Sequence, residues 1–185
     1  MDILRYKQKL HGFNSTEKYQ NELMLLMSLL DLKGNEKAID YGAGLGTAMK
    51  FLHEKTGHDI IGFDVTEELY EWDKFYFRKE IYFQVAAVYF MHSFSHIPFA
   101  DDLLRKCREV FLLPHGKLVI ISPNPDWLKL KQNPDYIPDP TVIKHYSLAE
   151  LIEIVTDAGF KVTASGQFGE AVGGANERIF IKAIS

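Results

Sequence analysis

Three glycines and two carboxylates are the residues whose spacing suggests chemistry. Gly42, Gly44 and Gly46 stand at alternate positions, and Asp40 precedes the first of them by two. Glycines between a strand and a helix allow a ligand to approach the backbone closely, and the helix start offers unpaired N–H groups. Asp64 follows Gly42 by 22 positions, close to the spacing at which a carboxylate binds ribose hydroxyls in dinucleotide-binding folds. These residues predict a ligand site.

The charges narrow the choice of ligand. A dinucleotide-binding loop places its third glycine three positions after the second, where this chain has Thr47, so a nucleotide-dependent oxidoreductase is disfavoured. Asp40 would also repel a pyrophosphate. A ligand with an ammonium group and a ribose but no phosphate suits both carboxylates, and S-adenosylmethionine is such a ligand. Two alternatives stay open: the glycines form a tight turn only, and Asp64 caps a helix that starts at Thr66.

The elements around this loop alternate between helix and strand. Apolar spacing and capping residues predict helices over residues 15–30, 47–55, 66–80, 101–111 and 147–158. Short apolar runs predict strands over residues 37–40, 59–63, 81–90, 117–122, 161–168 and 178–184. This alternation predicts a parallel sheet with helices on both faces. The last two strands are joined by a glycine-rich loop with no room for a helix, so they should be antiparallel. We expect one α/β domain of about six strands over residues 1–185, with an N-terminal arm over residues 1–14.

Five segments of the chain, taken in order, resemble the class I S-adenosylmethionine-dependent methyltransferases. They are residues 38–47 around the glycines, 60–65, 94–97, 108–124 and 145–160. The resemblance implies a Rossmann-like α/β fold with S-adenosylmethionine as cofactor. It also implies that Gly42 and Gly44 pass under the amino-acid part of the cofactor, that Asp40 holds its ammonium, and that Asp64 accepts the ribose hydroxyls. The other cofactor-binding residues that it implies are Ala43, Gly46, Val65, Phe90 and Met91.

The stretch after Asp64 is shorter than in the family. Gln84, the position that resembles the family's start of the fourth strand, follows Asp64 by only 20 positions, and the helix predicted over residues 66–80 uses most of them. We therefore expect the third strand to be missing or vestigial, which leaves the second strand at the sheet edge. The family's acidic residue for the adenine has no clear equivalent, because Asp73 and Glu80 also suit a solvated helix face. Tyr70 and Trp72 either close the adenine pocket or pack in the core.

Three histidines are candidates for the transfer step. His92 and His96 lie just past the fourth strand, and His145 follows a proline-rich excursion. Histidine is the side chain best suited to take a proton near neutral pH. The alternative for each of the three is a surface or capping role. No third and fourth ligand accompany the first pair at metal-binding spacing, so no metal is expected.

The proline-rich excursion is the expected substrate lid, over residues 123–146. Residues 123–140 hold five of the seven prolines and should be irregular. The sequence Asp-Pro-Thr at 139–141 resembles family members from saccharide and cell-envelope biosynthesis, although Val142 stands where those carry a histidine. The N-terminal arm either folds over the cofactor or frays. The candidate substrate-binding residues of the lid are Asn124, Trp127, Tyr136 and Tyr146.

Composition limits the partners. The chain has 21 Lys and Arg against 25 Asp and Glu, a net charge of −4, so direct nucleic-acid binding is not expected. Cys107 is the single cysteine, which excludes an internal disulfide and a cysteine metal cluster. Without a signal peptide or an 18-residue apolar run, we expect a cytoplasmic protein with no membrane association, as a monomer or homodimer.

The favoured function is methylation of a small molecule, with a sugar-type hydroxyl as acceptor. A non-catalytic binding or scaffold protein is the main alternative, and a protein or tRNA substrate presented by a partner subunit stays open.

Overall fold

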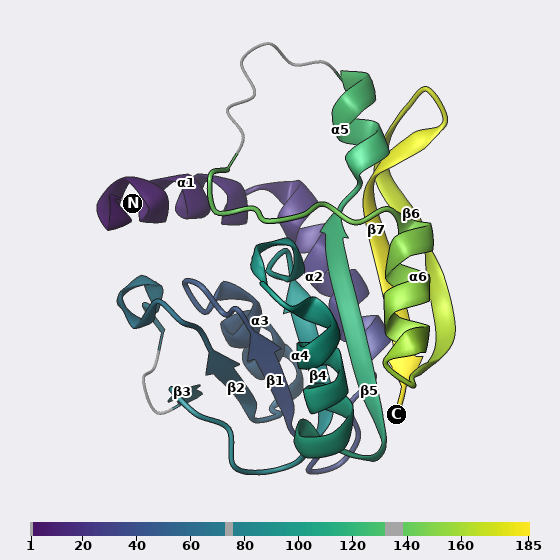
Figure 1. Ribbon diagram of the computed structural model, residues 1–185. Coiled ribbons are helices and arrows are strands. Elements are labelled where there is room, and N and C mark those ends of the chain that lie inside the picture. The colour runs from purple at the N-terminus through teal and green to yellow at the C-terminus, as the bar shows by residue number, and fades with distance from the viewer. Residues whose placement is uncertain (1, 73–75, 132–138) are drawn as a thin grey trace.

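The computed structural model describes residues 2–72, 76–131 and 139–185, without the side chain of Leu130. One seven-stranded sheet has the order β3-β2-β1-β4-β5-β7-β6 (Figure 1). Strands β1 to β5 run parallel, and β7 is antiparallel to both of its neighbours, β5 and β6. The strands span Ala38–Tyr41 (β1), Ile60–Phe63 (β2), Phe77–Arg78 (β3), Val85–Met91 (β4), Leu112–Pro123 (β5), Lys161–Val172 (β6) and Ala175–Ile184 (β7).

Helices cover both faces of the sheet. The described helices are α1 (Ile3–Asn14), α2 (Glu17–Leu30), α3 (Thr47–Thr56), α4 (Ala100–Lys106), α5 (Pro125–Lys131) and α6 (Leu148–Asp157). A π-helical turn, Cys107–Phe111, extends α4, and short 3-10 turns lie at Glu67–Leu69 and Phe94–His96. One apolar cluster packs α4 and α6 on the front face in Figure 1, and a second packs α2 and α3 on the back. The predicted mostly parallel α/β fold with an antiparallel C-terminal end is confirmed.

The parallel strands bring their carboxyl ends to one edge of the sheet. β1 lies between β2 and β4, and Ile39 is in register with both Ile61 and Val88. The residues that follow these strands therefore meet at the same edge, at the top of Figure 1. In open α/β sheets this edge is where ligands bind.

The segment after β2 differs in part from the prediction. The helix expected over residues 66–80 is wrong for the described residues there, which form the 3-10 turn and then β3. The third strand is indeed vestigial, because only Phe77 and Arg78 pair with β2. That short strand nevertheless covers β2, so β2 is not the edge strand and the sheet has seven strands rather than six. Asp73 lies outside the described residues.

The N-terminal arm is regular, and one further correction concerns the segment after β5. The N-terminal arm is the helix α1, and the Asp2 side chain caps it by accepting from the N–H groups of Leu4 and Arg5. The segment 123–140 is not irregular throughout, because α5 forms over Pro125–Lys131, with proline at the first helical position, where its missing N–H costs nothing. Over the described residues, no helix is long and apolar enough to cross a membrane.

Candidate cofactor and acceptor site

The loop from β1 to α3 can be built only with glycine at its two ends. Gly42 and Gly46 have φ values of 85° and 80°, in the left-handed region that side chains other than glycine rarely adopt. A Cβ atom at Gly42 would lie 2.3 Å from the Cβ of Ser93, and one at Gly46 would lie 2.7 Å from the ring of Tyr70. The glycines therefore let the loop pack closely against the segments after β4 and β2.

Asp40 is a buried carboxylate with an unused oxygen. It is 1% exposed, and its Oδ1 has no hydrogen-bond partner among the described residues. Burial raises the pKa of Asp40 to about 8; the neighbouring Tyr89 hydroxyl opposes this rise and the Asp64 carboxylate adds to it. A buried charge without a counter-ion is unfavourable, so this position suits a ligand that brings a cation. The ammonium group of S-adenosylmethionine is of this kind, so the residues present fit that cofactor.

Asp64 connects the end of β2 to the glycine loop. Its Oδ2 accepts from the backbone N–H of Gly44 at 2.8 Å, and its Oδ1 accepts from that of Thr66, also at 2.8 Å. Asp64 is not the N-cap of the 3-10 turn that follows, because that position is Thr66, which has no side-chain cap hydrogen bond. Each carboxylate oxygen has a second lone pair that can accept from a ribose hydroxyl. Its role toward a ribose stays a prediction.

The other predicted cofactor residues have different surroundings. Val65 is 91% exposed beside Asp64. Ala43 and Met91 are buried on the α2 and α3 side of the sheet. Phe90 is fully buried on the opposite side, where its ring packs edge-on against Phe94.

Helix α1 lies over the glycine loop, above the carboxyl ends of β1 and β2 in Figure 1. A Cβ atom at Gly44 would lie 3.9 Å from Leu10 Cδ1. Lys7 and His11 of α1 both contact the Glu71 carboxylate, at 3.1 and 2.8 Å. The N-terminal segment was expected either to fold over the cofactor or to fray. In the structure it folds over the expected cofactor position.

His92 belongs to a buried ionic network that the sequence did not indicate. Its Nε2 lies 2.5 Å from Glu22 Oε2, and the Nε of Arg178 donates to Glu22 Oε1 at 2.7 Å. Arg178 also pairs with Glu177 at 3.1 Å, and Glu177 with Lys18 at 2.6 Å. Burial alone would raise the pKa of Glu22, but His92 and Arg178 outweigh it and hold that pKa below its usual value. The one signal for this network in the sequence was Glu22, a charged residue that stands four positions before Leu26 on the apolar face of α2.

His96 belongs to a second chain of contacts, formed with Asp139 and Thr141 of the expected lid. Its Nδ1 lies 2.8 Å from Thr141 Oγ1, which donates to Asp139 Oδ1 at 2.6 Å. Lys9 of α1 contacts the other oxygen of Asp139 at 3.1 Å. His145 approaches His96: burial first, and then the charge of His96, lower the pKa of His145. Its buried Nδ1 has no partner within residues 2–72, 76–131 and 139–185. The structure thus brings His96 and His145 together and places His92 in a separate network.

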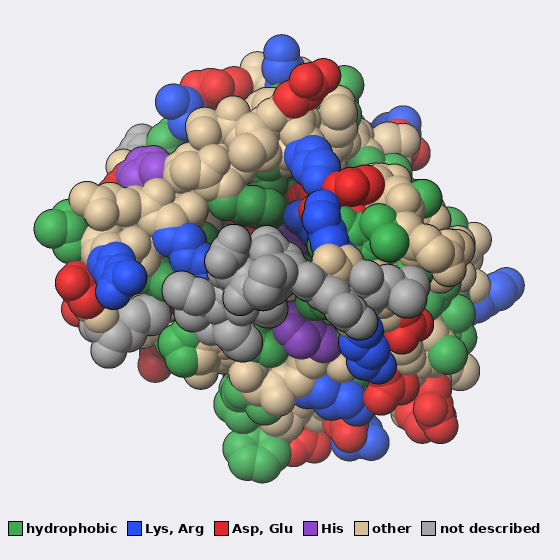
Figure 2. Space-filling model, turned by 90° about the horizontal axis from the view of Figure 1, so that it is seen from above, with side chains coloured by type: hydrophobic (Ala, Val, Ile, Leu, Met, Phe, Trp, Pro, Cys, Tyr) green, Lys and Arg blue, Asp and Glu red, His purple; other side chains and the backbone are tan. Residues whose placement is uncertain are grey.

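The edge that carries these groups is visible from above. Figure 2 shows histidine, Lys and Arg side chains around a hollow at this end of the molecule. Among the described residues, no three His, Cys, Asp or Glu side chains are grouped so that they could hold a metal ion.

The predicted substrate residues of the lid are mostly engaged within the protein. The Asn124 amide donates to Gln167 and to the carbonyl of Asn176, which ties the start of α5 to the C-terminal hairpin. Trp127 is buried, with the Lys131 ammonium 4.4 Å from its ring centre. Tyr146 is buried beside Phe94, with ring centres 5.3 Å apart, and Tyr136 lies outside the described residues. Their part in binding a substrate stays a prediction.

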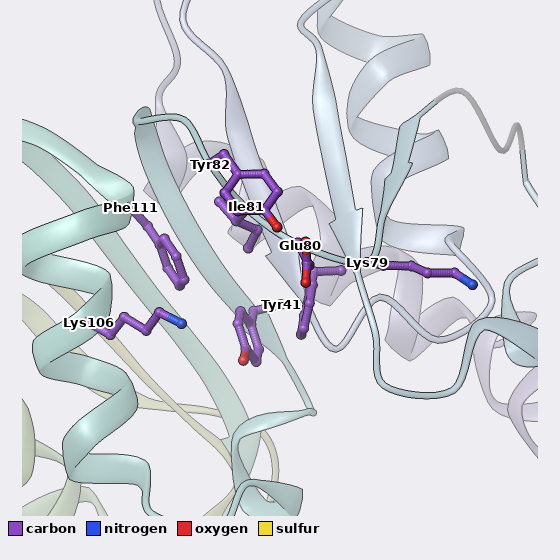
Figure 3. A pocket seen from close by; sticks show the side chains of 8 residues that line it. Tyr41, Lys79, Glu80, Ile81, Tyr82, Lys106 and Phe111 are labelled. Atoms are coloured by element: carbon purple, nitrogen blue, oxygen red, sulfur yellow. The ribbon is translucent and has the colours of Figure 1, made fainter.

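A separate cavity of about 240 Å³ lies beside α4, on the face of β1 and β2. Figure 3 shows the ammonium of Lys106 pointing toward the ring of Tyr41 across it. Its lining residues are Tyr41, Phe63, Lys79, Glu80, Ile81, Tyr82, Lys106 and Phe111. The six residues between β3 and β4 cross this face without forming a helix, which leaves the cavity open. The glycine loop and the histidine networks do not line it.

The family follows from a match over most of the chain. Residues 14–165 match the family model described as a methyltransferase domain. The chain belongs to this methyltransferase domain family. Its fold, its glycine loop and the carboxylates at the ends of β1 and β2 agree with the class I enzymes that use S-adenosylmethionine. The resemblance to that family is therefore confirmed. No curated protein matches the chain.

Solved structures of methyltransferases share the fold at low sequence identity. One is a chain from the complex between the Haloferax volcanii Trm112 methyltransferase activator and a protein proposed to be a methyltransferase. The TM-score is 0.75 at 13% identity, and the match covers 99% of this chain and 97% of that one. A S-adenosylmethionine-dependent methyltransferase from Aquifex aeolicus has a TM-score of 0.71, 20% identity, and coverage of 96% and 97%. Geranyl diphosphate C-methyltransferase from Streptomyces coelicolor, in a complex that includes S-adenosyl-L-homocysteine, has a TM-score of 0.63, 17% identity, and coverage of 90% and 80%.

Proposed function

We propose that this methyltransferase methylates a small molecule at a hydroxyl group, with a sugar-type hydroxyl as the favoured acceptor. The observation that carries the proposal is the buried Asp40 carboxylate, whose unused oxygen lies next to the glycine loop. S-adenosylmethionine, when bound, supplies a methyl group on a positively charged sulfur that departs with the bonding electrons. The protein then has to bind, align and deprotonate.

The cofactor half of the site follows from the residues at the ends of β1 and β2. Asp40 would ionise and pair with the ammonium group, because the ligand cation supplies the counter-ion without which this buried side chain favours its neutral form. Asp64 would accept the ribose hydroxyls with its remaining lone pairs. Leu10 of α1 would exclude water from above the loop, because it already lies over Gly44.

The acceptor half lies at the ends of β4 and β5, where His92, His96 and His145 are found. A hydroxyl is a weak nucleophile until a base removes its proton, and histidine is suited to that role near neutral pH. The saccharide class is supported by the Asp-Pro-Thr sequence at 139–141, whose Thr141 contacts His96.

Isothermal titration with S-adenosylhomocysteine tests the cofactor half. We expect micromolar binding to the wild-type protein, and at least tenfold weaker binding to Asp64→Ala. Glu54→Ala is the matched control, since Glu54 is an exposed acidic residue of α3, and its affinity should equal that of the wild type. A wild-type protein that shows neither heat nor thermal stabilisation at millimolar ligand would overturn the proposal, because a site at 100-fold saturation adds about 2.7 kcal/mol of stability.

A second candidate is a binding or scaffold protein that has kept the fold without the activity. It is favoured by the Asp64 carboxylate, both of whose oxygens already accept backbone N–H groups, and by the two-residue β3. The Haloferax neighbour was solved in a complex with an activator protein, which supports a search for a protein partner in that case. The same titration separates the two candidates, since a scaffold predicts no binding by the wild-type chain.

A further inference from the structure

We propose that His96 is the general base of this site, with its Nδ1 protonated and its Nε2 free to take a proton. Thr141 and Asp139 are positioning residues that hold it in this form. The inference rests on the proposed methyl transfer and selects one of the three histidines at the site.

The direction of the hydrogen bonds assigns the protons. Thr141 has one hydroxyl proton, which it donates to Asp139 Oδ1 at 2.6 Å. An ionised carboxylate only accepts, and Oδ1 also receives the Thr141 backbone N–H at 3.0 Å. Thr141 Oγ1 therefore offers only lone pairs to His96 Nδ1, 2.8 Å away. His96 Nδ1 must be the donor, so in the neutral ring the lone pair is on Nε2.

The groups around Asp139 keep its carboxylate ionised, so that it accepts the Thr141 hydroxyl proton throughout the neutral range. Burial alone would raise the pKa of Asp139, but the two bonds from Thr141 and the ammonium of Lys9 outweigh it and hold that pKa at about 2. The carboxylate is thus ionised throughout the neutral range. Tyr6 of α1 also faces Asp139 and Thr141 and stays protonated, because burial and the Asp139 charge raise its pKa. His145, the other titratable group against His96, has its pKa lowered by burial and by His96 and so stays neutral.

The other two histidines lack this arrangement. The Nε2 of His92 faces a carboxylate that also binds Arg178, so this nitrogen carries a proton and serves the ion pair. Its ring is packed against Phe13, with ring centres 5.4 Å apart. The Nδ1 of His145 is buried and has no hydrogen-bond partner in the part of the chain that the structure describes, so no described residue holds its proton on that nitrogen.

The proton transfer defines the class of acceptor. The acceptor hydroxyl oxygen forms a bond to the methyl carbon while the carbon–sulfur bond breaks and its electron pair goes to sulfur. The hydroxyl proton moves to His96 Nε2, and the resulting imidazolium is stabilised through Thr141 by the Asp139 carboxylate. The proton then passes to water. A base of this kind serves an acceptor that loses a proton as it is methylated, as a hydroxyl does.

Nitrogen-15 NMR of the histidine side chains tests the assignment without any ligand. The His96 signals are identified by their loss in His96→Gln. We expect neutral His96 in the wild type to carry its proton on Nδ1. Thr141→Val should release the ring, so that the Nε2–H form, which free imidazole side chains favour in water, becomes the major one. Thr141→Ser should restore the wild-type signals, and Thr156→Val, an exposed threonine of α6, should leave them unchanged.

A second variant covers the case in which Thr141→Val does not fold. Asp139→Ala removes the acceptor of the Thr141 hydroxyl proton, so that proton can be donated to His96 Nδ1 and the Nε2–H form should become the major one in the same NMR spectra. An Nε2–H form of His96 in the wild type, or the wild-type tautomer in both variants, would overturn the inference. Titration with S-adenosylhomocysteine is run in parallel: its failure removes the proposed function, whereas normal binding with unchanged histidine signals removes the assignment of the base alone.

Discussion

Arg178 of β7 and Glu22 of α2 form an ion pair of 2.7 Å that joins the C-terminal hairpin to the second helix. Both side chains are almost fully buried, with 6% and 3% of their surface exposed. The other Glu22 oxygen contacts His92, so one carboxylate meets two donors. Such a pair is stable only while all its members are present, because removing one leaves another charge buried without a partner.

Glu22→Gln should lower the free energy of unfolding by about 3 kcal/mol at pH 7, since it leaves Arg178 without its buried counter-ion. Urea unfolding measures this change. Glu153→Gln, an exposed glutamate of α6, is the control and should stay within about 0.5 kcal/mol of the wild type. Because the pKa of Glu22 is lowered in the folded protein, its contribution is present above the unfolded pKa and is lost as the pH falls through the folded value. The difference between the two proteins should therefore shrink in acid, and a difference that stays constant would contradict this account.

Asp40→Asn should stabilise the ligand-free protein at neutral pH. The folded-state pKa of about 8 exceeds the ordinary value of 3.8, so the folded protein binds the extra proton and loses stability as the pH rises between these values. An asparagine pays no such penalty, and each unit of pKa difference is worth about 1.4 kcal/mol. Melting temperatures at pH 5 and pH 8 should show a gain from the substitution that is larger at pH 8. Equal gains at the two pH values would place the cause outside this carboxylate.

Binding of S-adenosylhomocysteine should release a proton from Asp40 at pH 7. A ligand cation favours the ionised carboxylate, and most of the Asp40 groups are protonated before binding at that pH. Calorimetry in two buffers that differ in ionisation enthalpy counts the protons released. Asp40→Asn should bind at least tenfold more weakly and release fewer protons, and an equal proton count in both proteins would argue against contact with the ammonium.

Gly46→Ala should be more destabilising than Gly57→Ala by at least about 1 kcal/mol. These glycines flank the same helix, α3, and both have positive φ values, 80° and 74°. A Cβ atom at Gly57 meets nothing within 4 Å, so that variant should lose only the roughly 1–2 kcal/mol of backbone strain. At Gly46 the Cβ would also overlap the ring of Tyr70. Equal losses in urea unfolding would mean that the Tyr70 ring moves aside freely.

The segment after β2 shows where sequence periodicity misleads. Leu69, Trp72 and Tyr76 have helical spacing, yet the rings of Trp72 and Tyr76 stack on each other, 4.9 Å apart, and both pack against His53 of α3. The following residues Phe77 and Arg78 pair with β2. Contacts with α3 and with the edge of β2 outweighed the local preference for helix, and such contacts cannot be derived from spacing within the segment.

The sequence by itself determined the features that depend on neighbours along the chain. Alternating strands and helices with short connections predict the parallel sheet, and the glycines between Asp40 and Thr47 predict the turn at its carboxyl edge. The cap of α6 was equally local, since Ser147 and Glu150 satisfy each other's backbone N–H groups. Only the tertiary structure decided the acid–base network. Glu22 meets Arg178 across 156 positions and His96 meets Thr141 across 45, and the protonation of a histidine depends on which partner occupies its other nitrogen.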